Sequence, residues 1–154
     1  METVERLAAI EAIRQVKARY FRGVDNQDSA LVRSILAEDC VLDYRGCCTD
    51  PATGIDHLPM MNKVMEGRAS WPDAVPSEGP RLVTVHQGHD PDITVDSESS
   101  ASGIWAFTDR LFLPPGGPFS QLTGWGRYHE TYVNHGDGWK LRTTRIERLR
   151  VEVA

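Results

Sequence analysis

The spacing of apolar residues changes from a helical period to a strand period near Arg81, and this change restricts the folds open to the chain. Before that point, apolar side chains recur at steps of three or four residues. After it, they alternate with polar ones along residues 82–86, 93–95, 101–113, 123–134 and 139–153. Helices followed by strands predict an α+β fold, with the N-terminal helices covering the concave face of a curved antiparallel sheet.

The first half of the chain holds the predicted helices. Helical spacing predicts a long amphipathic helix over residues 4–24, and Asp28 or Ser29 can cap a short second helix. Residues 40–45 are rich in strand-forming residues and precede a glycine, which predicts the first strand. A third helix is predicted around Pro59, because proline suits a first helical turn and apolar residues follow at suitable spacing.

The second half predicts a meander of long strands. Proline and glycine in residues 114–118 and 135–138 mark two hairpin turns. The proline-rich stretch from Ser70 to Pro80 predicts a loop that can lie over a pocket mouth. A length of 154 residues suffices for one hydrophobic core, and we find no repeat or linker, so we expect one domain over residues 1–154.

The charge balance argues against nucleic acid as a partner. The 22 acidic and 17 basic residues leave a formal net charge of −5, which repels a phosphate backbone. Basic residues do gather between Lys140 and Arg150. Glu147 interrupts them, however, and we favour a solvated strand face as the interpretation.

The N-terminus and the cysteines predict a cytoplasmic protein. The first residues, with Glu5 and Arg6, have amphipathic spacing and lack the basic and apolar segments of a secretory signal. No apolar stretch approaches the roughly 18 residues of a membrane span. An odd number of cysteines does not suggest a disulfide framework, so we expect reduced thiols at Cys40, Cys47 and Cys48.

Two polar residues occupy positions that the pattern predicts to be buried. Asp25 follows the long helix, and His86 follows a strand-forming run, on the same side of the strand as Thr84. Each has an ordinary structural interpretation as well, because aspartate is common at helix ends and a lone strand histidine is more often structural than catalytic. From these residues alone, both interpretations stay open.

Several short motifs occur in an order that resembles the SnoaL-like family of the nuclear-transport-factor-2-like superfamily. The resemblance covers nearly the whole chain and rests on Tyr20, Gly23-Val24-Asp25, Asp28, Leu42-Asp43-Tyr44-Arg45, Thr84-Val85-His86-Gln87-Gly88 and Asp137-Gly138-Trp139-Lys140. It implies a curved antiparallel sheet closed toward a cone, an α+β barrel. It also implies a homo-oligomer, either a dimer or a trimer.

The enzyme types that the chain most resembles are scytalone dehydratase and hexachlorocyclohexane dehydrochlorinase. The resemblance implies a catalytic pair of Asp25 and His86, with Tyr44 orienting a water or a substrate oxygen, and a small apolar cyclic or aromatic substrate. A histidine held by a carboxylate can take a proton from carbon without a cofactor. Departure of a leaving group then gives an elimination, and return of the proton elsewhere gives an isomerisation.

Other side chains are candidates for binding the substrate. Tyr20 can donate to a developing enolate oxygen. Trp105 or Phe107 must face inward, and Arg127 and His129 can face the pocket together, with a solvent-facing strand as the alternative. A metal site needs three or four convergent ligands, and because no acidic motif completes such a set we expect none.

A second hypothesis is a non-catalytic small-molecule-binding or assembly module, because the same cone also serves as the small subunit of ring-hydroxylating dioxygenases. The co-occurrence of Asp25, His86 and Tyr44 favours chemistry. Two differences from the family's enzymes favour a module. Residues 105–111 lack the second pocket histidine of the dehydratase, and Tyr20 stands where the dehydrochlorinase has a basic residue.

Overall fold

The two N-terminal helices form where their spacing predicts them. The computed structural model describes residues 1–74 and 79–154 and contains helices α1 (Thr3–Asp25) and α2 (Ser29–Ile35). The Asp28 carboxylate caps α2 by accepting a 2.9 Å hydrogen bond from the backbone N–H of Leu31. Gln27, with a φ of 55°, turns the chain out of the first helix toward the second.

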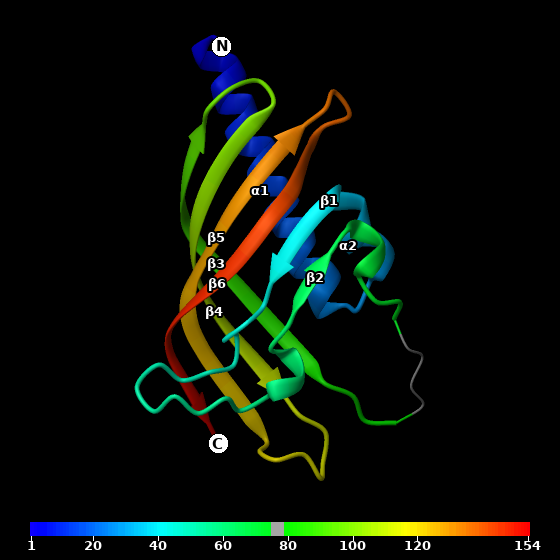
Figure 1. The fold of residues 1–154 in the computed structure, drawn as a ribbon, viewed down its shortest axis with the longest axis vertical. Coiled ribbons are helices and arrows are strands. Elements are labelled where there is room, and N and C mark those ends of the chain that lie inside the picture. Colours follow the sequence, from blue (N-terminus) through cyan, green and yellow to red (C-terminus); the bar gives the residue numbers. More distant parts are fainter. Residues whose placement is uncertain (75–78) are drawn as a thin grey trace.

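The strands form one six-stranded sheet, β1 (Leu36–Asp43), β2 (Val64–Glu66), β3 (Val83–Val95), β4 (Ser100–Phe112), β5 (Gln121–Asn134) and β6 (Trp139–Val153). Their spatial order is β2-β1-β6-β5-β4-β3, so the last four strands are the predicted antiparallel meander (Figure 1). β1 pairs with β6 in the parallel direction, which makes the sheet mixed. The predicted α+β fold with a curved sheet is confirmed, although the sheet stays open, with β2 and β3 at its edges.

The predicted third helix does not form. Only a single 3-10 turn, η1 (Pro59–Met61), is present, and the chain then extends into the short strand β2, followed by a second turn, η2 (Arg68–Ser70). Met65 is buried and pairs with Leu42 of β1, while Val64 is exposed. Helical spacing over so few residues is a weak signal, and hydrogen-bonded pairing with β1 gives the strand instead.

The two strands predicted at residues 82–86 and 93–95 form a single strand, β3, which begins at Val83. β3 continues through His89 to Asp92, where the pairing with β4 shifts and Asp90 has a φ of 27°. A bulge of this kind leaves residues out of the ladder, which accommodates Pro91 and its missing N–H. Part of the loop expected from Ser70 to Pro80, residues 75–78, lies outside the described residues.

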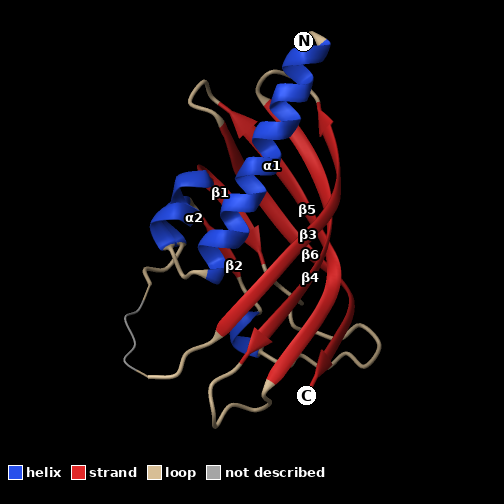
Figure 2. Cartoon of the chain, turned by 180° about the vertical axis from the view of Figure 1, so that it is seen from behind, coloured by secondary structure: helices blue, strands red, loops and turns tan. Residues whose placement is uncertain are grey.

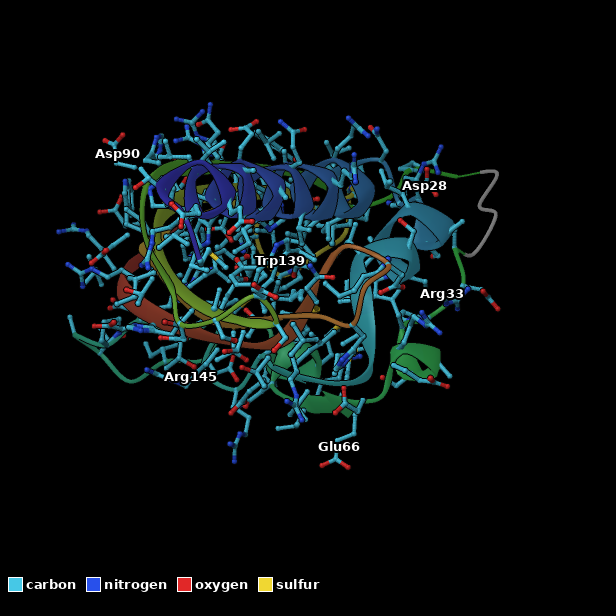
Figure 3. The ribbon with its side chains drawn as sticks, turned by 90° about the horizontal axis from the view of Figure 1, so that it is seen from above. Asp28, Arg33, Glu66, Asp90, Trp139 and Arg145 are labelled. Atoms are coloured by element: carbon cyan, nitrogen blue, oxygen red, sulfur yellow. The ribbon has the colours of Figure 1, made fainter. Side chains whose placement is uncertain are left out.

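Helix α1 lies across the concave side of the sheet and encloses the core beneath it. Figure 2 shows both helices on the same face of the sheet. Every odd-numbered residue of β4 from 101 to 111 is buried, as is every even-numbered residue of β5 from 122 to 132. From α1, Ile13, Val16 and Tyr20 pack onto this buried face. Arg145 lies on the other side of the sheet, away from the helix (Figure 3).

Gly126 allows two strands of the meander to approach closely. It sits at an irregularity in the pairing of β5 with β6, and a Cβ added there would lie 2.2 Å from the backbone oxygen of Glu147. We predict that Gly126→Ala lowers the free energy of unfolding by about 1–3 kcal/mol, measured by urea denaturation, because backbone must move to relieve the clash. A Gly126→Ala variant that is as stable as the original chain would contradict the prediction.

Two further observations concern features that the sequence suggests. Among the described residues, no helix combines the length and the apolar composition needed to cross a membrane. Cys40, Cys47 and Cys48 are all unpaired and buried in this structure.

Candidate active site

Asp25 and His86 meet where the end of α1 faces β3. Oδ1 of Asp25 lies 2.6 Å from Nδ1 of the His86 ring and accepts a 2.9 Å hydrogen bond from the Thr84 hydroxyl. Oδ2 accepts a 3.0 Å hydrogen bond from the backbone N–H of His86. Both carboxylate oxygens are therefore held by residues of β3.

These hydrogen bonds keep Asp25 ionised. Partial burial opposes the charged carboxylate, but the ring and backbone N–H groups of His86 and the Thr84 hydroxyl outweigh it and lower the pKa of Asp25. The carboxylate therefore contributes stability at pH values above the ordinary aspartate range, and this contribution is lost as the pH falls through its lowered pKa.

The other edge of the His86 ring faces a second carboxylate. Nε2 lies 4.0 Å from Oδ2 of Asp109, which is directly opposite His86 in the register of β3 and β4. Phe21 of α1 stacks on the ring at a centroid distance of 5.6 Å and an interplanar angle of 11°. Gly88 makes this stacking possible, because a Cβ there would lie 2.6 Å from the Phe21 ring. The ring is therefore fixed with Nδ1 on Asp25 and Nε2 toward Asp109.

Asp109 forms a buried two-point ion pair with Arg148 of β6. Nη1 and Nη2 of Arg148 donate to Oδ1 and Oδ2 of Asp109 at 2.7 and 2.8 Å, and both side chains are only 4% exposed. Nε of Arg148 donates to the backbone carbonyl of Cys47, and the guanidinium lies 4.9 Å from the centroid of the Phe107 ring. Burial disfavours the charged guanidinium, but the pair with Asp109 outweighs it and raises the pKa of Arg148.

A cavity of about 280 Å³ lies against His86, Asp109 and Arg148. Its remaining walls are mostly apolar or aromatic and include Tyr20, Tyr44, Trp71, Leu111, Tyr128 and Ile146. The exposed Lys63 also lines it and marks where it reaches the surface. Trp71 and Pro72 belong to the start of the loop that was expected near a pocket mouth. The polar groups thus stand together in an otherwise apolar space.

Two tyrosines of this cavity form a hydroxyl pair. The hydroxyl oxygens of Tyr20 and Tyr44 lie 2.7 Å apart, and both side chains are buried. Burial raises the pKa of both phenols, so they stay protonated at neutral pH. Because one hydroxyl uses its proton for the other, one O–H of the pair is left to donate elsewhere.

The structure places four predicted substrate-binding residues outside this cavity. Phe107 lies behind it, with its ring 4.3 Å from that of Tyr128, and Trp105 donates a 2.9 Å hydrogen bond to the Tyr132 hydroxyl deeper in the core. Arg127 and His129 point to the outer face of the sheet, where both contact Glu147. The alternation of β5 puts odd-numbered residues on that side, which is the solvent-facing alternative for these two residues.

The outer face has a larger hollow, of about 470 Å³, which His129, Val41 and Ile104 line. It also carries a histidine–carboxylate pair, with Nε2 of His129 2.6 Å from Oε2 of Glu147. Those side chains are 29% and 40% exposed, against 11% and 23% for His86 and Asp25. Water screens the outer pair more strongly, so the pair beneath α1 is the better placed for chemistry.

The sequence interpretation missed Asp109 and Arg148. Asp109 occupies an inward position on a strand where every other inward residue of the run 101–111 is apolar or glycine, and a charged residue in such a position is an available signal. Arg148 lies in the basic stretch from Lys140 to Arg150, for which the sequence favours a solvated strand face. Irregular pairing between β5 and β6 changes which β6 residues point inward, and this shift cannot be read from alternation.

A second buried network, around Lys17 of α1, was also missed. Nζ of Lys17 lies 2.6 Å from Oε1 of Glu130, and both side chains are almost fully buried. Thr144 and Tyr132 donate to the same carboxylate. The ammonium group also lies 3.4 Å from the centroid of the Tyr128 ring. Burial lowers the pKa of Lys17 to about 8, although Glu130 opposes the shift.

Within residues 1–74 and 79–154, no group of three or more histidine, cysteine, aspartate or glutamate side chains is arranged to hold a metal ion. The polar groups that line the cavity include the imidazole of His86, the carboxylate of Asp109, the guanidinium of Arg148 and three phenols, and the carboxylate of Asp25 lies behind the histidine. These groups can accept, donate and stabilise a proton.

An open curved sheet with a long helix across its concave face and a mostly apolar pocket beneath that helix defines an α+β protein of the nuclear-transport-factor-2-like architecture. The SnoaL-like domain matches residues 5–145, and the chain belongs to this family.

Solved structures share this fold over nearly the whole chain. Hexachlorocyclohexane dehydrochlorinase (LinA) type 2 is 18% identical with a TM-score of 0.78, and the alignment covers 99% of this chain and 93% of that one. A candidate scytalone dehydratase from Novosphingobium aromaticivorans DSM 12444 is 18% identical with a TM-score of 0.77, covering 99% and 92%. LinA type 3 from Novosphingobium barchaimii LL02 is 19% identical with a TM-score of 0.75, covering 99% and 94%.

Proposed function

We propose that the protein is a cofactor-independent lyase or isomerase, in which His86 takes a proton from carbon in a small apolar cyclic or aromatic compound. The observation that carries the proposal is the 2.6 Å contact between Asp25 Oδ1 and His86 Nδ1, with Nε2 turned toward Asp109 in the cavity. The names of the similar structures, a dehydrochlorinase and a candidate dehydratase, support eliminations as the reaction class.

The arrangement suits a general base. When Nδ1–H donates to Asp25, the neutral imidazole carries its lone pair on Nε2, the atom on the cavity side. A proton taken by Nε2 creates an imidazolium, and the ionised Asp25 stabilises that charge. Phe21 holds the ring plane, so the base needs little reorganisation before it acts.

The cavity also supplies donors for the charge that leaves the carbon. The free O–H of the Tyr20–Tyr44 pair can donate to a carbonyl oxygen as an enolate forms. Arg148 has five N–H groups, of which Asp109 and the Cys47 carbonyl use three. The remaining two can donate to an oxygen or a halogen of a leaving group. In an elimination, the leaving group departs after the proton is taken. In an isomerisation, the proton returns to a different atom of the substrate.

The size and walls of the cavity define the substrate class. A space of about 280 Å³ with mostly apolar walls suits a molecule of one or two rings with few polar groups. A panel of cyclic ketones, hydroxylated aromatics and halogenated rings, screened for product release with and without a chelator, tests the proposal. Turnover that survives chelation supports it. Ligands that bind without turnover, and without exchange of a carbon-bound proton with solvent, would replace it with a binding module.

The homo-oligomer implied by the family resemblance is a further proposal. Val41 and Ile104 are exposed apolar side chains that line the outer hollow, a surface that a second copy of the chain can cover. Sedimentation velocity at increasing protein concentration measures the state of assembly.

Asp25→Asn should lower turnover by about 10²–10⁴, the usual contribution of a positioned base and its orienting carboxylate. An amide nitrogen in the place of Oδ2 would face the backbone N–H of His86, so the amide turns its nitrogen toward the ring. Nδ1 must then accept, which moves the proton to Nε2 and removes the base. The rate constant at saturating substrate measures this effect.

Thr84→Val is the matched control for that variant, because it also removes one hydrogen bond to Oδ1 of Asp25 but leaves the carboxylate. Its rate should stay within about threefold of the original, in line with the modest worth of one neutral hydrogen bond. If the two variants lose turnover equally, the orienting role of Asp25 is wrong.

A further inference from the structure

Two neighbouring cysteines form part of the cavity wall and have no part in the proton transfer proposed above. Cys47 and Cys48 are both free, both more than nine-tenths buried, and both line the space beside Asp109 and Arg148. Their sulfur atoms lie 3.8 Å apart. The third cysteine, Cys40, is buried in β1 and is not part of this wall.

The turn after β1 brings the two thiols to the same side. Side chains of adjacent residues in an extended strand point to opposite faces, so two neighbouring cysteines would normally diverge. Here the backbone N–H of Cys47 donates to Tyr44 at 3.0 Å, and that of Thr49 donates to Gly46 at 3.1 Å. Gly46 has a φ of 74°, a conformation that favours glycine. Arg148 fixes the turn to β6 through the Cys47 carbonyl.

The separation of the sulfurs is close to what two bonds to one soft atom require. Trivalent arsenic is pyramidal, so two sulfurs bound to it at about 2.3 Å with an angle of about 95° stand roughly 3.4 Å apart, and the two sulfurs here, 3.8 Å apart, need to approach by only a few tenths of an ångström. We propose that Cys47 and Cys48 form a chelating dithiol site for trivalent arsenicals that carry an aromatic ring, with arsenic bridging the sulfurs and the ring in the cavity.

The cavity has room for such a ring. An apolar cavity of about 150 Å³ can hold benzene, and the space here is about 280 Å³. Tyr20, Tyr128 and Ile146 supply the apolar walls. The Cys48 thiol and the charge of Arg148 lower the pKa of Cys47 against the effect of burial, which assists reaction through its thiolate.

The reaction balances without an oxidant. In phenylarsine oxide, arsenic(III) is bonded to one ring carbon and one oxygen. The two sulfurs form As–S bonds, the arsenic–oxygen bond breaks, and the oxygen leaves as water with the two thiol protons. Arsenic stays trivalent and the cysteines are not oxidised. The binding does not depend on His86, so it is independent of the proposed catalytic function.

Protection mapping on the original chain tests the site without any substitution. The protein is treated with one equivalent of phenylarsine oxide, alkylated with iodoacetamide under denaturing conditions without competing thiol, and cleaved with trypsin. Cleavage after Arg33, Arg45 and Lys63 separates Cys40, in residues 34–45, from the pair in residues 46–63. We expect one arsenic per chain and protection of both thiols in residues 46–63, with Cys40 alkylated. Protection of Cys40, or alkylation of both Cys47 and Cys48, would overturn the proposal.

Single substitutions measure the chelate effect. Cys47→Ser and Cys48→Ser should each weaken retention of phenylarsine oxide by about 10²–10⁴, since the second bond is intramolecular once the first has formed. Cys40→Ser is the matched control and should bind as the original does. Ethanedithiol should release arsenic from the original chain. Equal retention by the two pocket variants and the control would overturn the bridging geometry.

Discussion

His86→Gln should lower turnover by about 10²–10⁴ while leaving the affinity for the same ligand nearly unchanged. The glutamine side chain keeps polar atoms in the cavity but has no basic nitrogen, so it can bind and cannot take a proton. Exchange of the reacting carbon-bound proton with deuterated solvent should fall in parallel with the rate. Three measurements together separate chemistry from binding: an initial-rate assay of turnover, a binding isotherm for the ligand, and the rate of proton exchange.

His129→Gln is the matched control, because His129 makes a carboxylate contact of the same length on the outer face of the sheet. It should leave rate, affinity and exchange within about twofold of the original values. If both variants lose activity equally, or if proton exchange persists in His86→Gln, the base is elsewhere.

Glu130→Gln should be the most destabilising of the substitutions considered, by about 3 kcal/mol near pH 6.5 in urea denaturation. The change leaves Lys17, which is 1% exposed, without its only carboxylate partner among the described contacts. Tyr132 and Thr144 lose a charged acceptor at the same time. The isosteric amide creates no cavity, so the loss reports on charge and hydrogen bonding.

The same substitution should become less harmful as the pH rises. In the original chain Lys17 keeps its proton up to its lowered pKa of about 8. Below that pH, Lys17 therefore adds little to the pH dependence of the free energy of unfolding. Without Glu130 the folded state favours the neutral amine at a lower pH, while the unfolded state still binds the proton. Over the pH range in which only the unfolded variant binds this proton, the free energy of unfolding of the variant rises by about 1.4 kcal/mol per pH unit. The difference in stability between the two proteins therefore narrows.

Asp39→Asn is the control for an exposed ion pair, since Asp39 lies 3.0 Å from Arg142 with both side chains half-exposed or more. Its effect should be below about 0.5 kcal/mol at every pH in the range. A Glu130→Gln variant that is no less stable than this control at pH 6.5 would show that Lys17 does not need its partner.

The sequence predicts the fold well where apolar periodicity is long. Helix α1 and strands β4, β5 and β6 follow their patterns closely, because ten or more residues repeat one period and each has a buried face. The errors fall in short segments. Around Pro59 the helical pattern is short, and the strand that forms instead depends on a hydrogen-bonded neighbour, β1, which is more than twenty residues earlier in the chain.

The candidate site was predictable to the extent that it uses local positions. Asp25 at a helix end and His86 on a strand come together because α1 crosses the sheet, and the family resemblance already implies that crossing. Asp109 and Arg148 depend on register across three strands, which a single sequence does not reveal. The same limit applies to Arg127 and His129. A shift of one residue along β5 would move both side chains from the outer face of the sheet to the pocket face.

The tautomer of His86 is the most direct test of the proposed base, and it needs no substrate. NMR identifies which ring nitrogen holds the proton, through long-range correlations between the carbon-bound ring protons and the ¹⁵N nuclei. The spectra are recorded in the pH range where the ring is neutral. We predict a protonated Nδ1, donating to Asp25, and an unprotonated Nε2; in Asp25→Asn the two nitrogens should exchange roles. A neutral His86 with its proton on Nε2 in the original chain would show that His86 is not the base, because the cavity-facing nitrogen would then have no lone pair with which to take a proton.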